Sequence, residues 1–264
     1  MEKTGIVVCG AGGRMGRLII QLAMENPGFV VTAGVETDSR LAGEVSSMGI
    51  RVVASLSDLS LCGNVVIDFT KPEATSEIIG ICAEKRAGAV VGTTGLNKAQ
   101  KDKVAEASEV IPVFFAPNMS LGVNLFMEVI RVASSLMKEY EAEISEIHHH
   151  FKKDAPSGTA RKIAEIICET TGRRYEDVAK CGREGTGDAR SRDEIGIHSL
   201  RIGDIVGEHS VYFGGRGEIM EFTHRCYNRE SFASGALKAA RFISGKKAGM
   251  YNMQDLIKEE TKVC

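Results

Sequence analysis

The chain of 264 residues carries a formal net charge of −2 and is 43% hydrophobic and 26% charged, which is ordinary for one large or two smaller globular domains. The mixed charge gives no general basic surface, and no stretch approaches the roughly 18 apolar residues that span a bilayer, so we expect neither a nucleic-acid nor a membrane partner. Seven scattered cysteines without close pairs, and an N-terminus that enters a strand almost at once, indicate reduced thiols in a cytoplasmic protein without a signal peptide.

The N-terminal segment predicts a strand, a glycine turn and a helix. Residues 4–9 have the pattern of a strand, G-A-G-G-R-M-G follows, and an apolar helical pattern comes next. Gly10, Gly13 and Gly16 match the spacing G-x-x-G-x-x-G. The stricter G-x-G-x-x-G fails because Met15 takes its last position. Glycines at the observed spacing permit a tight turn and the close approach of a pyrophosphate to the helix N-terminus.

A second predicted strand, residues 29–35, ends at Glu36, which lies 20 residues after Gly16. A carboxylate at this place can bind both ribose hydroxyls of an adenosine and would repel a 2′-phosphate. The next residue is Thr37 rather than arginine, although Arg40 is close enough to weaken the preference. We therefore predict a dinucleotide site that uses NADH and/or NADPH, with NADH at least as good.

Strand and helix alternate further along the chain. Strands are predicted at 65–69, 89–91 and 110–115, a helix begins at Pro72 after D-F-T-K, and a long helix covers 121–140. In an open parallel sheet, ligands lie beyond the carboxyl ends of the strands. The residues predicted at such ends are Gly92, Thr93, Thr94, Ala116, Asn118 and Met119.

The alternation stops after residue 140, where strands separated by glycine-rich turns predict a second, antiparallel or mixed sheet. These strands are expected at 142–149, 195–201, 205–213 and 218–225. Residues 173–193 show little periodicity and are expected to form a mobile excursion. An alanine-rich helix at 231–243 is expected to return to the first domain.

The predicted fold is therefore α/β in two domains. A Rossmann-type dinucleotide-binding domain is expected to comprise residues 1–119 plus 229–264. An inserted α+β domain for substrate binding and oligomerisation, built on a mixed sheet, is expected at residues 120–228.

The stretch E-I-H-H-H-F-K-K-D-A-P-S-G-T-A, residues 146–160, combines imidazoles, ammonium groups and a helix start. The apolar spacing after it predicts a helix that begins near Ser157, with Ser157 or Thr159 as the capping residue. Free backbone N–H groups at this end, together with a neighbouring lysine, would bind a small anion such as a carboxylate. The imidazoles can exchange protons near neutral pH.

Two other interpretations of the three adjacent histidines remain open. A histidine run is often only a solvated strand end. A metal site is less favoured, because on a strand His148 and His150 share one face while His149 faces the other, and no Cys-x-x-Cys or His-Glu-x-x-His accompanies them. We therefore assign no metal ligand. The remaining histidines are expected to be structural residues of the second sheet: His198, His209 and His224.

The chain carries a set of six motifs: G-A-G-G-R-M-G, D-F-T-x-P-E, G-T-T-G, A-P-N-M-S-x-G-V-N, H-H-x-x-K-x-D-A-P-S-G-T-A and R-x-G-D-I-V-G-E-H. With these motifs it resembles the dihydrodipicolinate reductase family, the 4-hydroxy-tetrahydrodipicolinate reductases of the diaminopimelate route to lysine. The resemblance covers essentially the whole chain. The fifth motif is close to unique to that family, whereas the glycine loop alone is not.

The resemblance implies a role for each matching residue. His148 would be the acid/base histidine and Lys152 the proton-donating lysine, so these two are the expected catalytic residues. The expected substrate-binding residues are His149, Ser157, Gly158 and Thr159. The expected cofactor-binding residues are Gly10, Ala11, Gly12, Gly13, Arg14, Met15, Glu36, Gly92, Thr93, Thr94, Ala116, Pro117, Asn118 and Met119. His150 and Phe151 fall at positions that vary in the family.

The resemblance also implies the reaction and the assembly. The expected substrate is a small cyclic imine-type dicarboxylate, which loses water and then accepts hydride from NAD(P)H at ring C4 and a proton on the adjacent carbon. Homotetramers would form through the second-domain sheet, and domain closure would need hinges near Ser120 and Asn228. Three alternatives stay open: another dinucleotide-dependent dehydrogenase of an amino-dicarboxylate, a non-enzymatic NADH sensor, and a zinc protein built on the histidine cluster.

Overall fold

The structure, a computed structural model, describes residues 3–261 and divides into two compact units. The described residues up to Leu121, together with those from Arg229 onward, form unit 1. Unit 2 comprises Gly122–Asn228. The chain therefore leaves unit 1 once, builds unit 2 without interruption, and returns.

Unit 1 contains a seven-stranded parallel sheet in the order β12-β6-β5-β4-β1-β2-β3. Its strands are β1 (Thr4–Cys9), β2 (Phe29–Val35), β3 (Val52–Val53), β4 (Asn64–Asp68), β5 (Gly88–Val91), β6 (Pro112–Phe115) and β12 (Gly249–Tyr251). The strand order reverses between β1 and β4, which are neighbours in the sheet. In a sheet of this kind the crevice for a ligand opens at the carboxyl ends of the strands beside that reversal.

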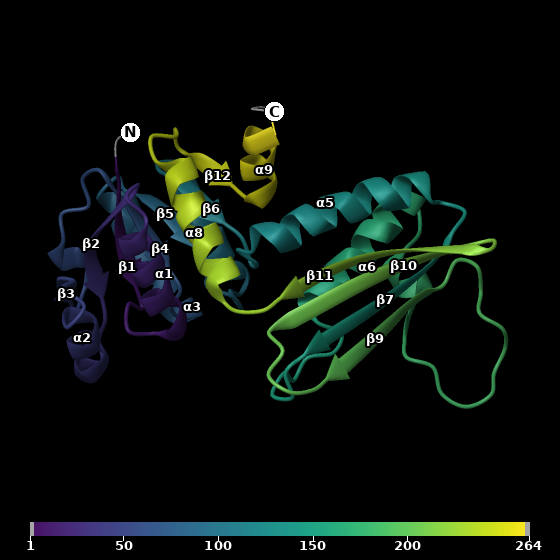
Figure 1. The fold of residues 1–264 in the computed structure, drawn as a ribbon. Coiled ribbons are helices and arrows are strands. Elements are labelled where there is room, and N and C mark those ends of the chain that lie inside the picture. The colour runs from purple at the N-terminus through teal and green to yellow at the C-terminus, as the bar shows by residue number, and fades with distance from the viewer. Residues whose placement is uncertain (1–2, 262–264) are drawn as a thin grey trace. The chain divides into compact units, whose positions relative to one another are not determined.

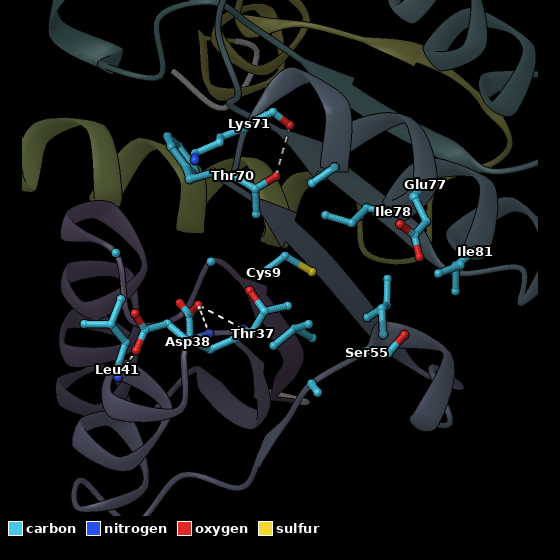
Figure 2. A pocket seen from close by; sticks show the side chains of 18 residues that line it. Cys9, Thr37, Asp38, Leu41, Ser55, Thr70, Lys71, Glu77, Ile78 and Ile81 are labelled. Carbon is cyan, nitrogen blue, oxygen red and sulfur yellow. Dashed lines mark hydrogen bonds between the residues drawn. The ribbon is translucent and has the colours of Figure 1, made fainter.

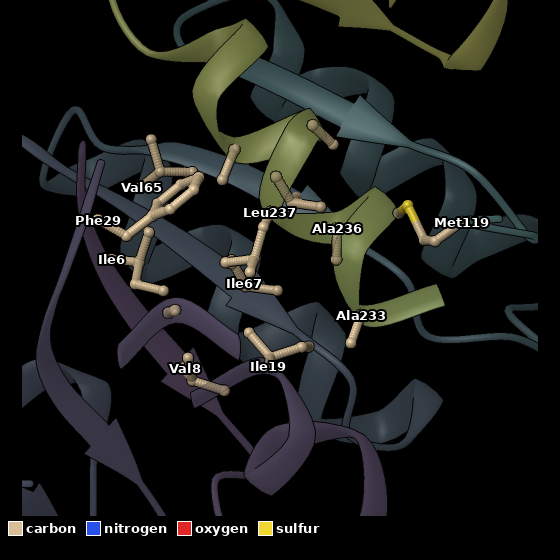
Figure 3. Close-up of a cluster of buried hydrophobic side chains, with 14 of the residues drawn as sticks. Ile6, Val8, Ile19, Phe29, Val65, Ile67, Met119, Ala233, Ala236 and Leu237 are labelled. Carbon is tan, nitrogen blue, oxygen red and sulfur yellow. The ribbon is translucent and has the colours of Figure 1, made fainter. Parts of the chain in front are cut away.

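Helices cover both faces of this sheet. On one face, side chains of α1 (Arg14–Glu25), α8 (Glu230–Ile243) and α9 (Met253–Thr261) form a continuous core with β1 and β4. Figure 3 shows Ile19 of α1 and Leu237 of α8 directed toward Ile67 of β4. The opposite face is covered by α3 (Pro72–Glu84) and α4 (Lys98–Ser108). Two short elements, α2 (Ser39–Ser46) and the 3₁₀ turn η1 (Leu56–Asp58), complete the unit.

Unit 2 contains a five-stranded mixed sheet in the order β11-β10-β7-β9-β8. Its strands are β7 (Glu141–His148), β8 (Ala179–Cys181), β9 (Ile195–Arg201), β10 (Gly207–Gly215) and β11 (Glu218–Cys226). The β7, β8 and β9 strands are parallel, whereas β10 is antiparallel to β7 and β11. Two helices, α5 (Leu121–Leu136) and α6 (Gly158–Thr171), pack their apolar sides on one face of the sheet (Figure 1). The short α7 (Tyr175–Val178) leads into β8.

The predicted fold class, a Rossmann-type domain with an inserted α+β domain on a mixed sheet, is confirmed. Ser157 caps α6 as expected, because its hydroxyl accepts a hydrogen bond from the backbone N–H of Ala160 at 3.1 Å. The alanine-rich helix, α8, belongs to unit 1. None of the helices in residues 3–261 is long and apolar enough to cross a membrane.

Two local expectations were wrong. The long helix ends at Leu136 rather than residue 140, because Tyr140 turns to contact Gly215 and bonds to Glu218. Residues 173–193, expected to form a mobile excursion, include the two short elements α7 and β8, and β8 is hydrogen-bonded to β9. The strand of the histidine run ends at His148, so the next two histidines lie in a turn and do not alternate between sheet faces.

Candidate active site

The glycine turn of unit 1 leads directly from β1 into α1. Gly10 has φ +71, a left-handed conformation that side chains rarely adopt, and its carbonyl accepts the N–H of Gly13 at 3.0 Å. A Cβ at Gly16 would lie 2.1 Å from this carbonyl oxygen, and a Cβ at Gly12 would lie 2.4 Å from the Cβ of Leu41. These positions therefore require glycine, and the turn presents its backbone at the N-terminus of α1.

Glu36, directly after β2, is held over this turn by backbone N–H groups. Its Oε2 accepts a hydrogen bond from Gly12 at 3.0 Å. Its Oε1 accepts from Thr37 at 2.9 Å and from Asp38 at 3.1 Å. The carboxylate therefore occupies a fixed place beside the glycine turn, where the sequence predicts a ribose contact.

A cavity of about 610 Å³ lies next to these groups (Figure 2). Apolar side chains line one part of it, among them Val35, Ile78 and Ile81. The cavity wall also includes Lys71 and Glu77, which no expectation from the sequence included. An apolar slot beside a carboxylate and a glycine turn fits the adenosine half of a dinucleotide.

A buried carboxylate, Asp68, links the loops that follow β4 and β5 by hydrogen bonds. Asp68, 1% exposed at the end of β4, accepts hydrogen bonds from the Thr70 hydroxyl at 2.6 Å and the Thr75 hydroxyl at 2.5 Å. The Thr93 hydroxyl donates to Asp68 Oδ2, the oxygen that also accepts from Thr75, at 3.1 Å. Thr93, one of the expected cofactor residues, is therefore occupied in joining the loops after β4 and β5.

The other expected cofactor residues divide by exposure. Arg14, Thr94 and Pro117 are exposed at the ends of β1, β5 and β6. Ala11 and Ala116 are buried, and the Met119 side chain, 2% exposed, belongs to the hydrophobic core with α8. Buried residues of this kind can offer a ligand only their backbone. The residues present thus fit a dinucleotide, with the glycine turn for its pyrophosphate and Glu36 for a ribose.

The chemistry of unit 2 centres on a buried carboxylate at Glu146 of β7, which is 0% exposed. Its Oε2 lies 2.5 Å from Nδ1 of His148 on the same strand. Arg201 at the end of β9 binds it through both terminal nitrogens, at 2.9 and 2.8 Å. Burial alone would raise the pKa of Glu146, but hydrogen bonds from His148 and Arg201 outweigh it and hold that pKa well below its usual range.

The start of α6 is joined to the same cluster. The backbone N–H of Ser157 donates to Glu146 Oε1 at 3.1 Å. The Ser157 hydroxyl lies 3.1 Å from Nε2 of His209 on β10, and the His209 ring packs edge-on against that of His148, with centroids 5.2 Å apart. Burial, aided by the nearby charge of His148, lowers the pKa of His209 to about 3. His209 is therefore neutral in the physiological range.

The remaining expected substrate residues lie on the turn after β7 and at the start of α6. Lys152 Nζ forms an ion pair with Asp154, at 2.8 and 2.9 Å from its two carboxylate oxygens. Gly158 is exposed and Thr159 is half-buried at the first turn of α6. Nδ1 of His149 is buried and has no hydrogen-bond partner among residues 3–261.

The side chains of the three adjacent histidines do not share a partner. His148 faces Glu146, and Nδ1 of His150 lies 2.9 Å from the carbonyl oxygen of Gly203. Within the described part of the chain, no group of three or more His, Cys, Asp or Glu side chains is arranged to hold a metal ion.

The cluster contains two residues to which the sequence assigned no chemistry, Glu146 and Arg201, and one expected to be structural, His209. Arg201 and His209 lie close to His148 because their strands, β9 and β10, flank β7. In the sheet register His148 is opposite Arg201, and Glu146 is opposite His209. The signal in the sequence was the motif R-x-G-D-I-V-G-E-H, which begins at Arg201 and ends at His209.

Comparison with known proteins covers both units. Residues 4–119 match the family Dihydrodipicolinate reductase, N-terminus, and residues 122–257 match Dihydrodipicolinate reductase, C-terminus. A 4-hydroxy-tetrahydrodipicolinate reductase from Hahella chejuensis is 43% identical over 263 residues, which cover 96% of this chain and 98% of the relative. A second one, from Syntrophus aciditrophicus, is 42% identical over 260 residues, covering 95% and 97%.

A solved structure is similar over nearly the same extent. Dipicolinate-bound dihydrodipicolinate reductase from Paenisporosarcina sp. TG-14 superposes with a TM-score of 0.76 at 26% sequence identity. The alignment covers 95% of this chain and 97% of that chain.

Proposed function

This chain belongs to the dihydrodipicolinate reductase family and is an oxidoreductase, and from that premise we propose that it reduces 4-hydroxy-tetrahydrodipicolinate to tetrahydrodipicolinate in the diaminopimelate route to lysine. The observation that carries the proposal is the buried Glu146–His148 pair at the end of β7, followed at once by Lys152 and the start of α6. A dipicolinate-bound relative of the same fold supports a small dicarboxylate as the ligand.

The residues of unit 2 provide the charges and proton donors that such a substrate needs. Backbone N–H groups at the start of α6, with the Thr159 hydroxyl, would hold one carboxylate. Lys152, released from Asp154, would pair with the substrate and deliver the proton to carbon. His148 would exchange a proton through Nε2, and His149 would contact the substrate beside it.

The proposed reaction balances as a dehydration followed by a reduction. The substrate first loses its hydroxyl group as water, and the conjugated ring then gains a hydride at C4 and a proton on the adjacent carbon. When bound, NAD(P)H supplies that hydride. The glycine turn from Gly10 to Gly13 would hold its pyrophosphate and Glu36 its adenosine ribose.

The decisive test is oxidation of NADH when freshly generated 4-hydroxy-tetrahydrodipicolinate is added to the purified chain. His148→Gln and Lys152→Met should each lower kcat by roughly 10²-fold or more, if each is an acid/base group. His150→Gln is the matched control, because this exposed imidazole contacts a backbone carbonyl and the Phe151 ring, and it should keep kcat within about twofold. Values of kcat within about threefold of wild type for both variants would contradict the assignment.

The proposed cofactor preference is for NADH at least as much as NADPH. The Glu36 carboxylate would repel a 2′-phosphate on the ribose, and two nearby arginines already pair with another carboxylate. Arg40 bonds to Glu44 at 3.0 Å, and Arg17 forms an ion pair with the same carboxylate. The measurement is kcat/KM for both cofactors under the same conditions, and a large NADPH preference would overturn the proposal.

The proposed assembly is a homotetramer formed through the sheet of unit 2. Exposed apolar side chains on β9 and β11 support it, because Leu200 and Ile219 are 46% and 71% exposed. An assembly through the sheet could cover them. Light scattering on the full chain should give a mass of four times the 28.5 kDa of one chain.

A further inference from the structure

We propose that Glu146 is a positioning residue for His148, and that Arg201 holds Glu146 in the orientation this requires. The inference rests on the proposed role of His148 and assigns to the buried carboxylate the task of fixing which imidazole nitrogen carries the proton. Glu146 touches neither substrate nor cofactor in this account and acts only through the ring.

The contact with Glu146 determines the tautomer of the His148 imidazole. A carboxylate can only accept a hydrogen bond, so the 2.5 Å contact between Glu146 Oε2 and His148 Nδ1 requires the proton to be on Nδ1. In the neutral ring, Nε2 then keeps its lone pair and can accept a proton. Among residues 3–261 no hydrogen-bond partner of His148 Nε2 is found, so this nitrogen is the one available for exchange with a ligand.

Arg201 determines the orientation of the Glu146 carboxylate. Glu146 is completely buried, and its hydrogen bonds include one from His148, one from the Ser157 backbone and two from Arg201. Arg201 is itself fixed, because it also donates to the carbonyl oxygens of Asp154 and Leu200. The planar guanidinium therefore leaves the carboxylate one orientation, with Oε2 toward the imidazole.

Glu146 acts on His148 by orienting its ring rather than by adding charge beside it. Arg201 neutralises Glu146, so the pair adds little net charge beside His148 and the main effect is on tautomer and ring direction. His209, which packs edge-on against the ring, is neutral in the physiological range.

Glu146→Gln is the informative variant, because it keeps the shape of the side chain but replaces one acceptor by an NH₂ donor. Arg201 donates to both oxygens, so the NH₂ of the amide faces a donor whichever way it is turned, and the arrangement cannot survive intact. Of the donors around it, only His148 can become an acceptor, by carrying its proton on Nε2 instead of Nδ1. The matched control is Glu143→Gln. This carboxylate lies on the same strand and also binds a histidine and arginines, His198, Arg183 and Arg190, but it does not contact His148.

The experiment uses the full chain with histidine nitrogens isotopically labelled, and His148 signals are assigned by their loss in His148→Gln. Nitrogen NMR distinguishes the two neutral tautomers. In the wild type and in Glu143→Gln, we expect His148 as the Nδ1–H form. In Glu146→Gln the Nε2–H form should become prominent, kcat should fall by roughly 10- to 100-fold, and KM should change by less than about threefold.

A wild-type His148 that carries its proton on Nε2 would overturn the inference, and this result does not depend on whether any variant folds. So would a Glu146→Gln protein that keeps the Nδ1–H form, whatever its kcat. Glu146→Asp, which retains both acceptors, should recover part of the lost kcat. If the wild type fails to reduce the dicarboxylate at all, the proposed function fails, while the tautomer still decides the positioning role separately.

Discussion

Gly207, the first residue of β10, lies so close to His148 that any side chain there would touch the imidazole. A Cβ at this position would be 3.1 Å from His148 Nε2 and 3.7 Å from Cε1 of His209. The nitrogen proposed to exchange a proton thus faces a position where glycine leaves space. Gly207 and Arg201 belong to the same motif, so this motif contributes more than one of the residues around the His148 ring.

Gly207→Ala should lower kcat by about tenfold, because the added methyl crowds Nε2 and a small displacement of a catalytic group costs about 1.4 kcal/mol or more. Gly214→Ala is the control, since Gly214 lies on the same strand and an added Cβ would meet nothing within 4 Å. Steady-state kinetics on both variants is the measurement. Equal kcat for the two would show that space beside Nε2 has no role.

At the scale of an element, the segment between β8 and β9 is bound to β7 by arginines. Arg183 and Arg190 donate to Glu143 at 2.6 and 2.9 Å, and His198 Nε2 lies 2.8 Å from the same carboxylate. Burial opposes ionisation of Glu143, but these hydrogen bonds outweigh it and lower its pKa to about 2. Hydrogen bonds and ion pairs with Glu143 therefore attach this segment, in which the sequence shows little periodicity, to β7.

This cluster should make stability depend on pH in the acid range. Because the pKa of Glu143 is lower in the folded state than its ordinary value of 4.5, its contribution is complete above about pH 4.5 and is lost as pH falls toward about 2. The Tm difference between wild type and Glu143→Gln should therefore be largest near neutral pH and shrink toward about pH 2.

Glu141→Gln is the control for this measurement, because Glu141 is on the same strand but 50% exposed and 3.5 Å from Arg190. Its Tm should stay close to that of the wild type throughout the range, as is usual for exposed ion pairs. A Tm difference for Glu143→Gln that does not change with pH would contradict the account of the cluster.

At the scale of the whole molecule, the residues proposed for cofactor and substrate lie in different units. Glu36 and the glycine turn belong to unit 1, whereas His148, Lys152 and the start of α6 belong to unit 2. Mutations in the two units should therefore affect different ligands.

Calorimetric titration can test this separation with NADH and dipicolinate as probes. Glu36→Gln should weaken NADH binding by about tenfold or more, because a hydrogen bond to a charged group contributes about 1.5–3 kcal/mol, and should leave the Kd of dipicolinate within about twofold. Lys152→Met should have the opposite effect. Each variant serves as the control for the other, and weakening of both ligands by either variant would show that the two sites are coupled.

The sequence alone determined the features that depend on local pattern. Short apolar runs and helical spacing predicted the alternation of strands and helices in unit 1. Three glycines predicted the turn before α1, and a Ser-Gly-Thr start predicted the cap of α6. These features depend on neighbours within a few residues, so they can be read along the chain. The same holds for the resemblance, whose motifs are short and contiguous.

Only the tertiary structure decided which side chains surround His148. Arg201 and His209 are more than fifty residues away in sequence and become neighbours of Glu146 and His148 because β9 and β10 pair with β7 in a particular register. A shift of that register by one residue would direct every side chain to the other face of the sheet. Strand order and register follow from packing across the whole unit, which is why no local pattern could assign Glu146 its partners.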